Sequence, residues 1–268
     1  MKPDLVSLNI VPATATAAGL SEPASIARLT IERAHKSNAL NLETMAAFVE
    51  AVKAARADPT VRALVVTGAG EKAFVGGADI SEMADLNARK AREFITAVHH
   101  CCDALRSCEV PVIARINGVA FGAGLELAAA CDLRVAVDDA VLGMPEVKLG
   151  IPSVVEAALL PGLIGWGKTR EILLLGDNFG AAEALSWGLL NKVVGRSELD
   201  AVVEQWIASL LANGPASVRN QKALISQWER LLLPDAVEAG IYAFASAWEG
   251  TEPVAMMAAW REASAKRK

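Results

Sequence analysis

One acidic residue stands in an almost entirely apolar stretch of the sequence. Glu126 lies in the segment Leu125-Glu-Leu-Ala-Ala-Ala-Cys131. A buried carboxylate is costly unless it is paired, hydrogen-bonded or protonated, and burial raises its pKa. Because a raised pKa suits a carboxyl group to general acid or base catalysis, Glu126 is a candidate catalytic residue. A partly exposed or salt-bridged helix residue is the alternative.

Two glycine-containing turns could bring backbone N–H groups close to a ligand. Gly76-Gly-Ala-Asp79 follows a strand region, and Gly118-Val-Ala-Phe-Gly-Ala-Gly124 precedes the segment with Glu126. Glycine lets the backbone approach a ligand, and the free N–H groups at a helix start attract anionic oxygen. Two such turns could form an oxyanion hole, although turn geometry alone explains either one. Neither matches the glycine patterns of nucleotide-phosphate sites.

The histidines and cysteines form no recognisable metal or nucleophile pattern. The neighbours in His99-His-Cys-Cys102 face different directions on a helix, so a helix surface is a better reading than a zinc site. No GxSxG turn is present to support a Ser-His-Asp triad. The four cysteines fit neither a zinc ribbon nor a required disulfide framework, which favours a reduced, cytoplasmic location; they are Cys101, Cys102, Cys108 and Cys131.

Length and composition favour one large domain, or one domain with an appendage. The chain has 268 residues, of which 53% are hydrophobic and 21% charged, and its net charge is −5. This composition excludes a disordered chain, and the mild acidity gives no reason to expect a nucleic-acid partner. No apolar run approaches the roughly 18 residues of a membrane span, and we expect no signal peptide.

The candidate residues lie among alternating strands and helices. This alternation predicts an α/β fold with a parallel sheet and helical crossovers, with strands at 26–32, 61–68, 111–116 and 132–137 and helices at 41–56, 87–107 and 122–131. Asn41 is a good cap for the first helix. Four further helices follow, at 198–213, 215–232, 234–248 and 252–264. We therefore divide the chain into a core, 1–197, and a helical region, 198–268.

Three motifs in the α/β part keep their order and spacing as a set. They are Lys72-Ala-Phe-Val-Gly-Gly-Ala-Asp-Ile-Ser-Glu-Met83, Asn117-Gly-Val-Ala-Phe-Gly-Ala-Gly-Leu-Glu-Leu-Ala-Ala-Ala-Cys-Asp132 and Met144-Pro-Glu-Val-Lys-Leu-Gly150. The set strongly resembles the enoyl-CoA hydratase/isomerase (crotonase) superfamily, most like an enoyl-CoA hydratase. Ser37-Asn-Ala-Leu-Asn41 looks like the early CoA-binding segment of that family. The resemblance runs from about residue 24 to 265.

The resemblance implies both architecture and ligands. It implies a crotonase-like spiral of ββα units, a C-terminal helical trimerisation region, and a homotrimer or dimer of trimers. It also implies an acyl-CoA substrate, as in fatty acid metabolism. Coenzyme A is then part of the substrate, and no metal or separate cofactor is expected.

The resemblance also assigns roles to particular positions. The backbone N–H groups of Ala78 and Ala123 match the oxyanion-hole donors of the family, and alanine replaces a glycine common at the second position. Glu126 and Glu146 match the two carboxylates of the hydratases. Further positions match substrate or CoA contacts, namely Lys36, Ser37, Ala39, Asp79, Ile80, Ser81, Phe121 and Pro145.

The expected reaction is the reversible hydration of 2-enoyl-CoA to 3-hydroxyacyl-CoA. Two N–H donors would stabilise charge on the thioester oxygen, and two glutamates in different environments would exchange protons with water and Cα. Δ3-Δ2-enoyl-CoA isomerisation and non-catalytic acyl-CoA binding are the alternatives. We expect Met83, Phe121 and Leu142 to line the acyl pocket.

The C-terminal helical region is rich in large apolar side chains, which favours an oligomer, because extensive apolar surface usually marks an interface. These side chains include Trp206, Trp228, Tyr242, Phe244, Trp248 and Trp260. A self-contained helical subdomain is the alternative.

One segment departs from the family pattern. Gly150-Ile-Pro-Ser-Val-Val-Glu-Ala-Ala-Leu-Leu-Pro161 is one residue shorter than the corresponding segment of relatives before Pro152, and it lacks their later glycines. Its additional carboxylate, Glu156, could contact the substrate or retune Glu146. The S-x-x-E spacing of Ser153 and Glu156 favours a helix-capping box instead.

Overall fold

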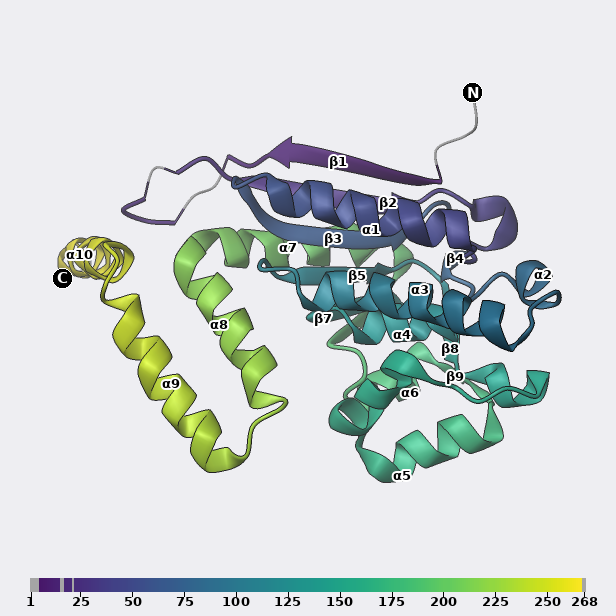
Figure 1. Ribbon diagram of the computed structural model, residues 1–268. Coiled ribbons are helices and arrows are strands. Elements are labelled where there is room, and N and C mark those ends of the chain that lie inside the picture. The colour runs from purple at the N-terminus through teal and green to yellow at the C-terminus, as the bar shows by residue number, and fades with distance from the viewer. Residues whose placement is uncertain (1–4, 15–16, 21, 267–268) are drawn as a thin grey trace.

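A computed structural model describes residues 5–14, 17–20 and 22–266, and its centre is a six-stranded sheet (Figure 1). The strand order is β1-β2-β3-β5-β7-β10. The strands are β1 (Val6–Pro12), β2 (Ser25–Ile31), β3 (Val61–Gly68), β5 (Val112–Ile116), β7 (Leu133–Val137) and β10 (Lys192–Val194). The predicted strands at 26–32, 61–68, 111–116 and 132–137 are confirmed to within one residue at each end.

The large sheet is parallel from β2 to β10, as the strand–helix alternation predicted. Only its edge strand β1 runs antiparallel to its neighbour, β2. Seven of the eight residues of β3 are buried, which is typical of a parallel strand covered on both faces. The sheet therefore forms the centre of the apolar core.

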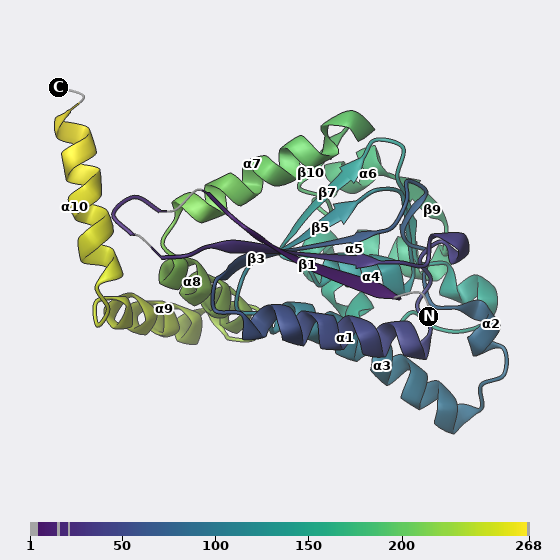
Figure 2. The same ribbon diagram turned by 90° about the horizontal axis from the view of Figure 1, so that it is seen from above.

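Helices cover both faces of this sheet (Figure 2). Helices α1 (Leu42–Ala57) and α3 (Ala88–Arg106) lie on one face, and α7 (Leu199–Ala212) lies on the other. The side chain of Asn41 caps α1 by accepting a hydrogen bond from Thr44 N at 3.0 Å, as predicted. Asn87 caps α3 in the same way, through Lys90 N at 3.0 Å.

A second, smaller sheet brings several chain turns together at one edge. Its order is β4-β6-β8-β9, with β4 (Ala73–Val75), β6 (Val119–Phe121) and β8 (Val141–Gly143) parallel and β9 (Asn178–Gly180) antiparallel to β8. The carboxyl ends of parallel strands meet at the same edge. The chain after β4 leads to Ala78, the chain after β6 to α4 (Ala123–Ala129), and the chain after β8 to the 3-10 helix η2 (Pro145–Leu149).

Two helices that come after β8 in the chain, one on either side of β9, were not predicted. Helix α5 (Leu160–Leu175) has a non-helical glycine inside it, Gly165, and α6 (Ala181–Ser186) is short. A further 3-10 helix, η3 (Val155–Leu159), leads into α5. This part of the chain lies below the large sheet in Figure 1.

The four predicted C-terminal helices are confirmed as α7, α8 (Pro215–Trp228), α9 (Leu233–Ala247) and α10 (Glu252–Ala265). Helices α9 and α10 extend away from the sheets in both views (Figures 1 and 2). Their apolar side chains are largely exposed within one chain, and Trp260, Tyr242 and Leu233 are 71, 75 and 78% exposed. Among the described residues, no helix combines the length and apolarity that a membrane span requires.

Candidate active site

A largely apolar pocket of about 750 Å³ opens at the edge where β4, β6 and β8 end. The turn after β4, the start of α4, η2 and one side of α3 all contribute to its wall. Seven of the predicted site residues line it, namely Ala78, Ile80, Phe121, Ala123, Glu126, Pro145 and Glu146. The structure therefore brings both predicted glutamates and both predicted backbone donors to one cavity.

Glu126 lies in the first turn of α4, and every residue of that helix is buried. Its residue surface is only 4% exposed, and its Oε1 accepts a hydrogen bond from Ala157 N at 3.0 Å. Burial raises the pKa of Glu126 to about 8. The Ala157 N–H acts in the opposite direction, and the charges of Glu146 and Glu156 add to the upward shift. Glu126 thus retains its proton near neutral pH.

Glu146 is half-buried in η2, where Ser153 and Gly122 both lie close to its carboxyl group. The hydroxyl of Ser153 donates to its Oε2 at 2.8 Å. On the other side, its Oε1 lies 2.2 Å from the position that a Cβ atom on Gly122 would occupy. Gly122 has a φ of 50°, in the left-handed region that favours glycine. A side chain at position 122 would therefore displace this carboxylate.

The two predicted backbone donors come from neighbouring turns of the small sheet. Ala78 forms an isolated parallel bridge with Leu40, and Ala123 is the first residue of α4. In the described part of the chain, neither N–H donates to a backbone carbonyl. The first N–H groups of a helix have no intrahelical acceptor, which leaves that of Ala123 available to a ligand.

The predicted CoA-binding segment lies beside the turn that holds Ala78. Ser37 O accepts from Gly76 N at 2.8 Å, and Leu40 O accepts from Asp79 N at 2.8 Å. Five predicted contact residues do not line the pocket wall but lie in these two segments beside it, namely Lys36, Ser37, Ala39, Asp79 and Ser81.

Asp79 is buried and holds the turn together. Its side chain pairs with Arg33 Nη2 at 2.9 Å and accepts from Ser81 N at 3.1 Å. Burial alone would raise the pKa of Asp79, but the hydrogen bonds from Arg33 and Ser81 bring it below its ordinary value. The carboxylate therefore anchors the loop that carries Ala78.

The expected acyl-pocket residues are partly corrected. Met83 and Phe121 line the cavity, but Leu142 is fully buried in β8 and does not. Helix α3 contributes Phe94, Ile95 and Val98 instead. The sequence predicted the helix but not which part of the protein it packs against, so these pocket residues were missed.

The predicted capping box of Ser153 and Glu156 is wrong. No side chain caps η3, because Ser153 bonds to Glu146 and Glu156 Oε1 lies 2.7 Å from His99 Nδ1. Glu146 belongs to η2 and His99 to α3, so the local spacing of Ser153 and Glu156 could not indicate these contacts. The described residues contain no cluster of three or more side chains suited to a metal.

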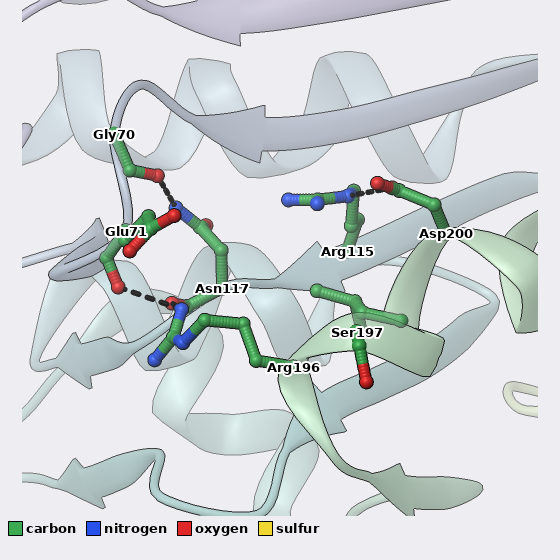
Figure 3. A pocket seen from close by; sticks show the side chains of 8 residues that line it. Gly70, Glu71, Arg115, Asn117, Arg196, Ser197 and Asp200 are labelled. Carbon is green, nitrogen blue, oxygen red and sulfur yellow. Dashed lines mark hydrogen bonds and ion pairs between the residues drawn. The ribbon is translucent and has the colours of Figure 1, made fainter.

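A second hollow of about 580 Å³ lies between the ends of β3 and β5 and the turn at Arg196 (Figure 3). Its cationic groups already have partners. Arg115 Nε donates to Asp200 Oδ1 at 2.6 Å, and Arg196 Nη1 donates to Asn117 O at 2.8 Å. Of the two carboxylates that line this hollow, Glu71 and Asp200, the second is already ion-paired with Arg115.

The family model for enoyl-CoA hydratase/isomerase matches residues 21–262. The chain therefore belongs to this family, its fold is the crotonase-like α/β fold, and within the family it is most like the enoyl-CoA hydratases. This likeness makes the protein a hydratase-type enzyme.

Two curated relatives and one solved structure illustrate the likeness. The crotonyl-CoA hydratase of Syntrophomonas wolfei is 41% identical over 209 residues, which are 78% of this chain and 80% of the relative. The short-chain-enoyl-CoA hydratase of Clostridium acetobutylicum is 38% identical with the same coverage. The enoyl-CoA hydratase structure from Bacillus anthracis has a TM-score of 0.86 at 29% identity, over 95% of this chain and 96% of that one.

Proposed function

We propose that this enzyme catalyses the reversible hydration of 2-enoyl-CoA thioesters to 3-hydroxyacyl-CoA. The observation that carries the proposal is the pair Glu126 and Glu146, which line one pocket in different environments beside two backbone N–H donors. The names of the similar hydratases support the same reaction class.

The Ala78 and Ala123 N–H groups would form the oxyanion hole. When water adds to Cβ, negative charge develops on the thioester oxygen. Two preorganised donors can stabilise this oxygen because they are fixed before the reaction begins. Asp79 supports the arrangement by fixing the turn of Ala78 through its pair with Arg33.

The two glutamates would carry out the two proton transfers. One proton leaves the attacking water, and one is delivered to Cα of the thioester. The raised pKa keeps a proton on Glu126 near neutral pH, while Ser153 orients the carboxylate of Glu146. Two carboxyl groups with separated environments are suited to this division of acid and base roles.

The pocket wall supports an apolar acyl chain as the substrate group. Phe94, Ile95, Val98 and Ile151 lie around the cavity, with Met83 at α2 (Ile80–Met83). Turnover of a panel of 2-enoyl-CoA thioesters, of rising length and with polar members, should favour the apolar chains. Equal turnover of a chain with a terminal carboxylate would contradict this substrate class.

The test of the proposed reaction is the loss of enoyl-thioester absorbance with purified protein and crotonyl-CoA. Glu126→Gln and Glu146→Gln should each lower kcat by at least ~10²-fold while the protein stays folded. Near-full activity in either variant would contradict the two-glutamate mechanism. Isomerisation of a 3-enoyl-CoA without hydration would favour the isomerase, and no turnover of either substrate would favour an acyl-CoA-binding protein.

We also propose a homotrimer or a dimer of trimers. The exposed apolar side chains of α8 to α10 support an interface, because large apolar patches are uncommon on monomers. The patch includes Ile225, Trp228, Leu232, Leu233, Val237, Ile241, Tyr242, Phe244, Trp248, Val254, Met257 and Trp260. Sedimentation equilibrium should give a multiple of the 28.1 kDa chain mass, and a stable monomer would contradict the proposal.

A further inference from the structure

A buried glutamate behind the pocket is joined to a histidine at the protein surface. Glu156 is only 7% exposed and does not line the pocket, whereas the side chain of His99 on α3 is 47% exposed. Glu156 Oε1 and His99 Nδ1 lie 2.7 Å apart. In the described residues, Glu156 Oε2 is buried with no hydrogen-bond partner. Burying a carboxylate with one oxygen unpartnered is costly. Glu156 has little contact with solvent and does not line the pocket, so its burial calls for another explanation.

The pair lies next to the contact that holds Glu126. Ala157, which follows Glu156 in η3, donates its N–H to Glu126 Oε1 at 3.0 Å. Glu156 thus ties one end of η3 to α3, and the next residue of the same turn reaches Glu126 on α4.

The backbone just before the pair is strained. Val155 has a φ of 41°, a left-handed backbone conformation that is rare and unfavourable for a β-branched residue. Such a conformation persists only where the surrounding contacts hold it, and these sites cluster near functional groups. The two residues that follow Val155 make the contacts described above, Glu156 with His99 and Ala157 with Glu126.

We propose that His99 and Glu156 form a positioning pair, which clamps η3 to α3 and thereby aims the Ala157 N–H at the Glu126 carboxyl group. The inference rests on the proposed catalytic part of Glu126. His99 and Glu156 do not touch the substrate in this arrangement. They fix the orientation of a group that does.

The effect of the Glu156 charge on Glu126 can be distinguished from its positioning role, because few titratable groups lie nearby. The carboxylate of Glu156 contacts His99 on α3. The other titratable groups of this region are Glu126 on α4, Glu146 on η2, and Cys101 and Cys102 on α3. Burial raises the pKa of Cys101 to about 12 and that of Cys102 well above its ordinary value, so both thiols stay neutral. The charge of Glu156 raises the pKa of Glu126.

The first test removes the clamp from its exposed end. His99→Ala should lower kcat for crotonyl-CoA roughly 10- to 100-fold, because small displacements of a catalytic group have effects of this size. KM should change by less than about 3-fold, since neither residue of the pair lines the pocket. His99→Asn, whose amide can replace the Nδ1 donor, should restore most of kcat. His100→Ala, on the exposed next position of the same helix, is the matched control and should retain full activity.

The second test changes the buried end. Glu156→Ala combined with His99→Ala should lower kcat no further than His99→Ala alone, because the two residues act as one unit. Glu156→Gln keeps an acceptor for His99 but removes the charge, so it should retain kcat within about 3-fold. Its pH–rate profile should shift to lower pH at the limb that reports Glu126, because a neutral neighbour no longer raises that pKa.

The outcomes separate this inference from the proposed function. Wild-type kcat and pH profile in folded His99→Ala would overturn the positioning role, whatever Glu126→Gln does. An equal loss in His99→Asn and His99→Ala would also overturn it. If Glu126→Gln itself retains full activity, the proposed function fails instead.

Discussion

Replacing Glu126 by glutamine should lower kcat by at least ~10²-fold and, at alkaline pH, stabilise the protein. The pKa of Glu126 is raised from 4.5 to about 8, chiefly because the residue is buried. The unfolded chain releases this proton near the ordinary value, so between these pH values the folded state binds more protons than the unfolded state. The stability of the wild type must then fall as pH rises from about 4.5 through 8.

The magnitude follows from the pKa difference between the folded and the unfolded chain. Each pKa unit corresponds to about 1.36 kcal/mol, so the full loss above pH 8 is at most roughly 5 kcal/mol. Glu126→Gln avoids this loss because an amide does not ionise. Its carbonyl oxygen can still accept the Ala157 N–H that now bonds to Oε1. Between about pH 5.5 and pH 9, the stability of the variant relative to the wild type should increase by roughly 3 kcal/mol.

Urea unfolding at both pH values, at one fixed protein concentration, measures this difference. The fixed concentration matters because the stability of an oligomer depends on it. A stability difference between variant and wild type that is the same at both pH values would refute the buried, protonated state of Glu126. So would a variant that becomes relatively less stable at the higher pH.

Three other changes test the surroundings of the site. Gly122→Ala would place a Cβ 2.2 Å from Glu146 Oε1 at a φ of 50°, so kcat should fall at least ~10²-fold, and unchanged kinetics would contradict the observed packing. Ser153→Ala removes the hydroxyl that donates to Glu146 and should lower kcat roughly 10-fold, with a stability loss of about 1 kcal/mol in urea unfolding. A thiol reagent should label none of the four cysteines of the folded protein, because all are buried and the pKa of each is raised. Rapid labelling of Cys101, Cys102, Cys108 or Cys131 before unfolding would contradict their burial.

The sequence predicted the long elements because their patterns are local. The apolar spacing and the Asn41 cap identified α1, and the continuous apolar run identified α4 as buried. The strands of the small sheet span only three residues each, too few to show an alternation. For the same reason the sequence could not tell that Leu142 faces the core rather than the pocket.

The candidate site was predictable where a motif carries it, and unpredictable where tertiary contacts decide. Glu126 was recognisable because a carboxylate in an apolar run is unusual. Ser153 and Glu156 have the spacing of a capping box, but Glu146 and His99 compete for their side chains. A contact across 57 residues, such as that between His99 and Glu156, leaves no local signal in one sequence.

The central claim, that the pocket adds water across an enoyl thioester, is tested most directly by the fate of the solvent oxygen. Wild-type protein and crotonyl-CoA are incubated in ¹⁸O-labelled water, and the product is analysed by mass spectrometry. The account predicts one labelled oxygen in a 3-hydroxyacyl product, with formation slowed at least ~10²-fold in Glu126→Gln and in Glu146→Gln. An isomerised product without label, or labelled product formed at the wild-type rate by either variant, would contradict it.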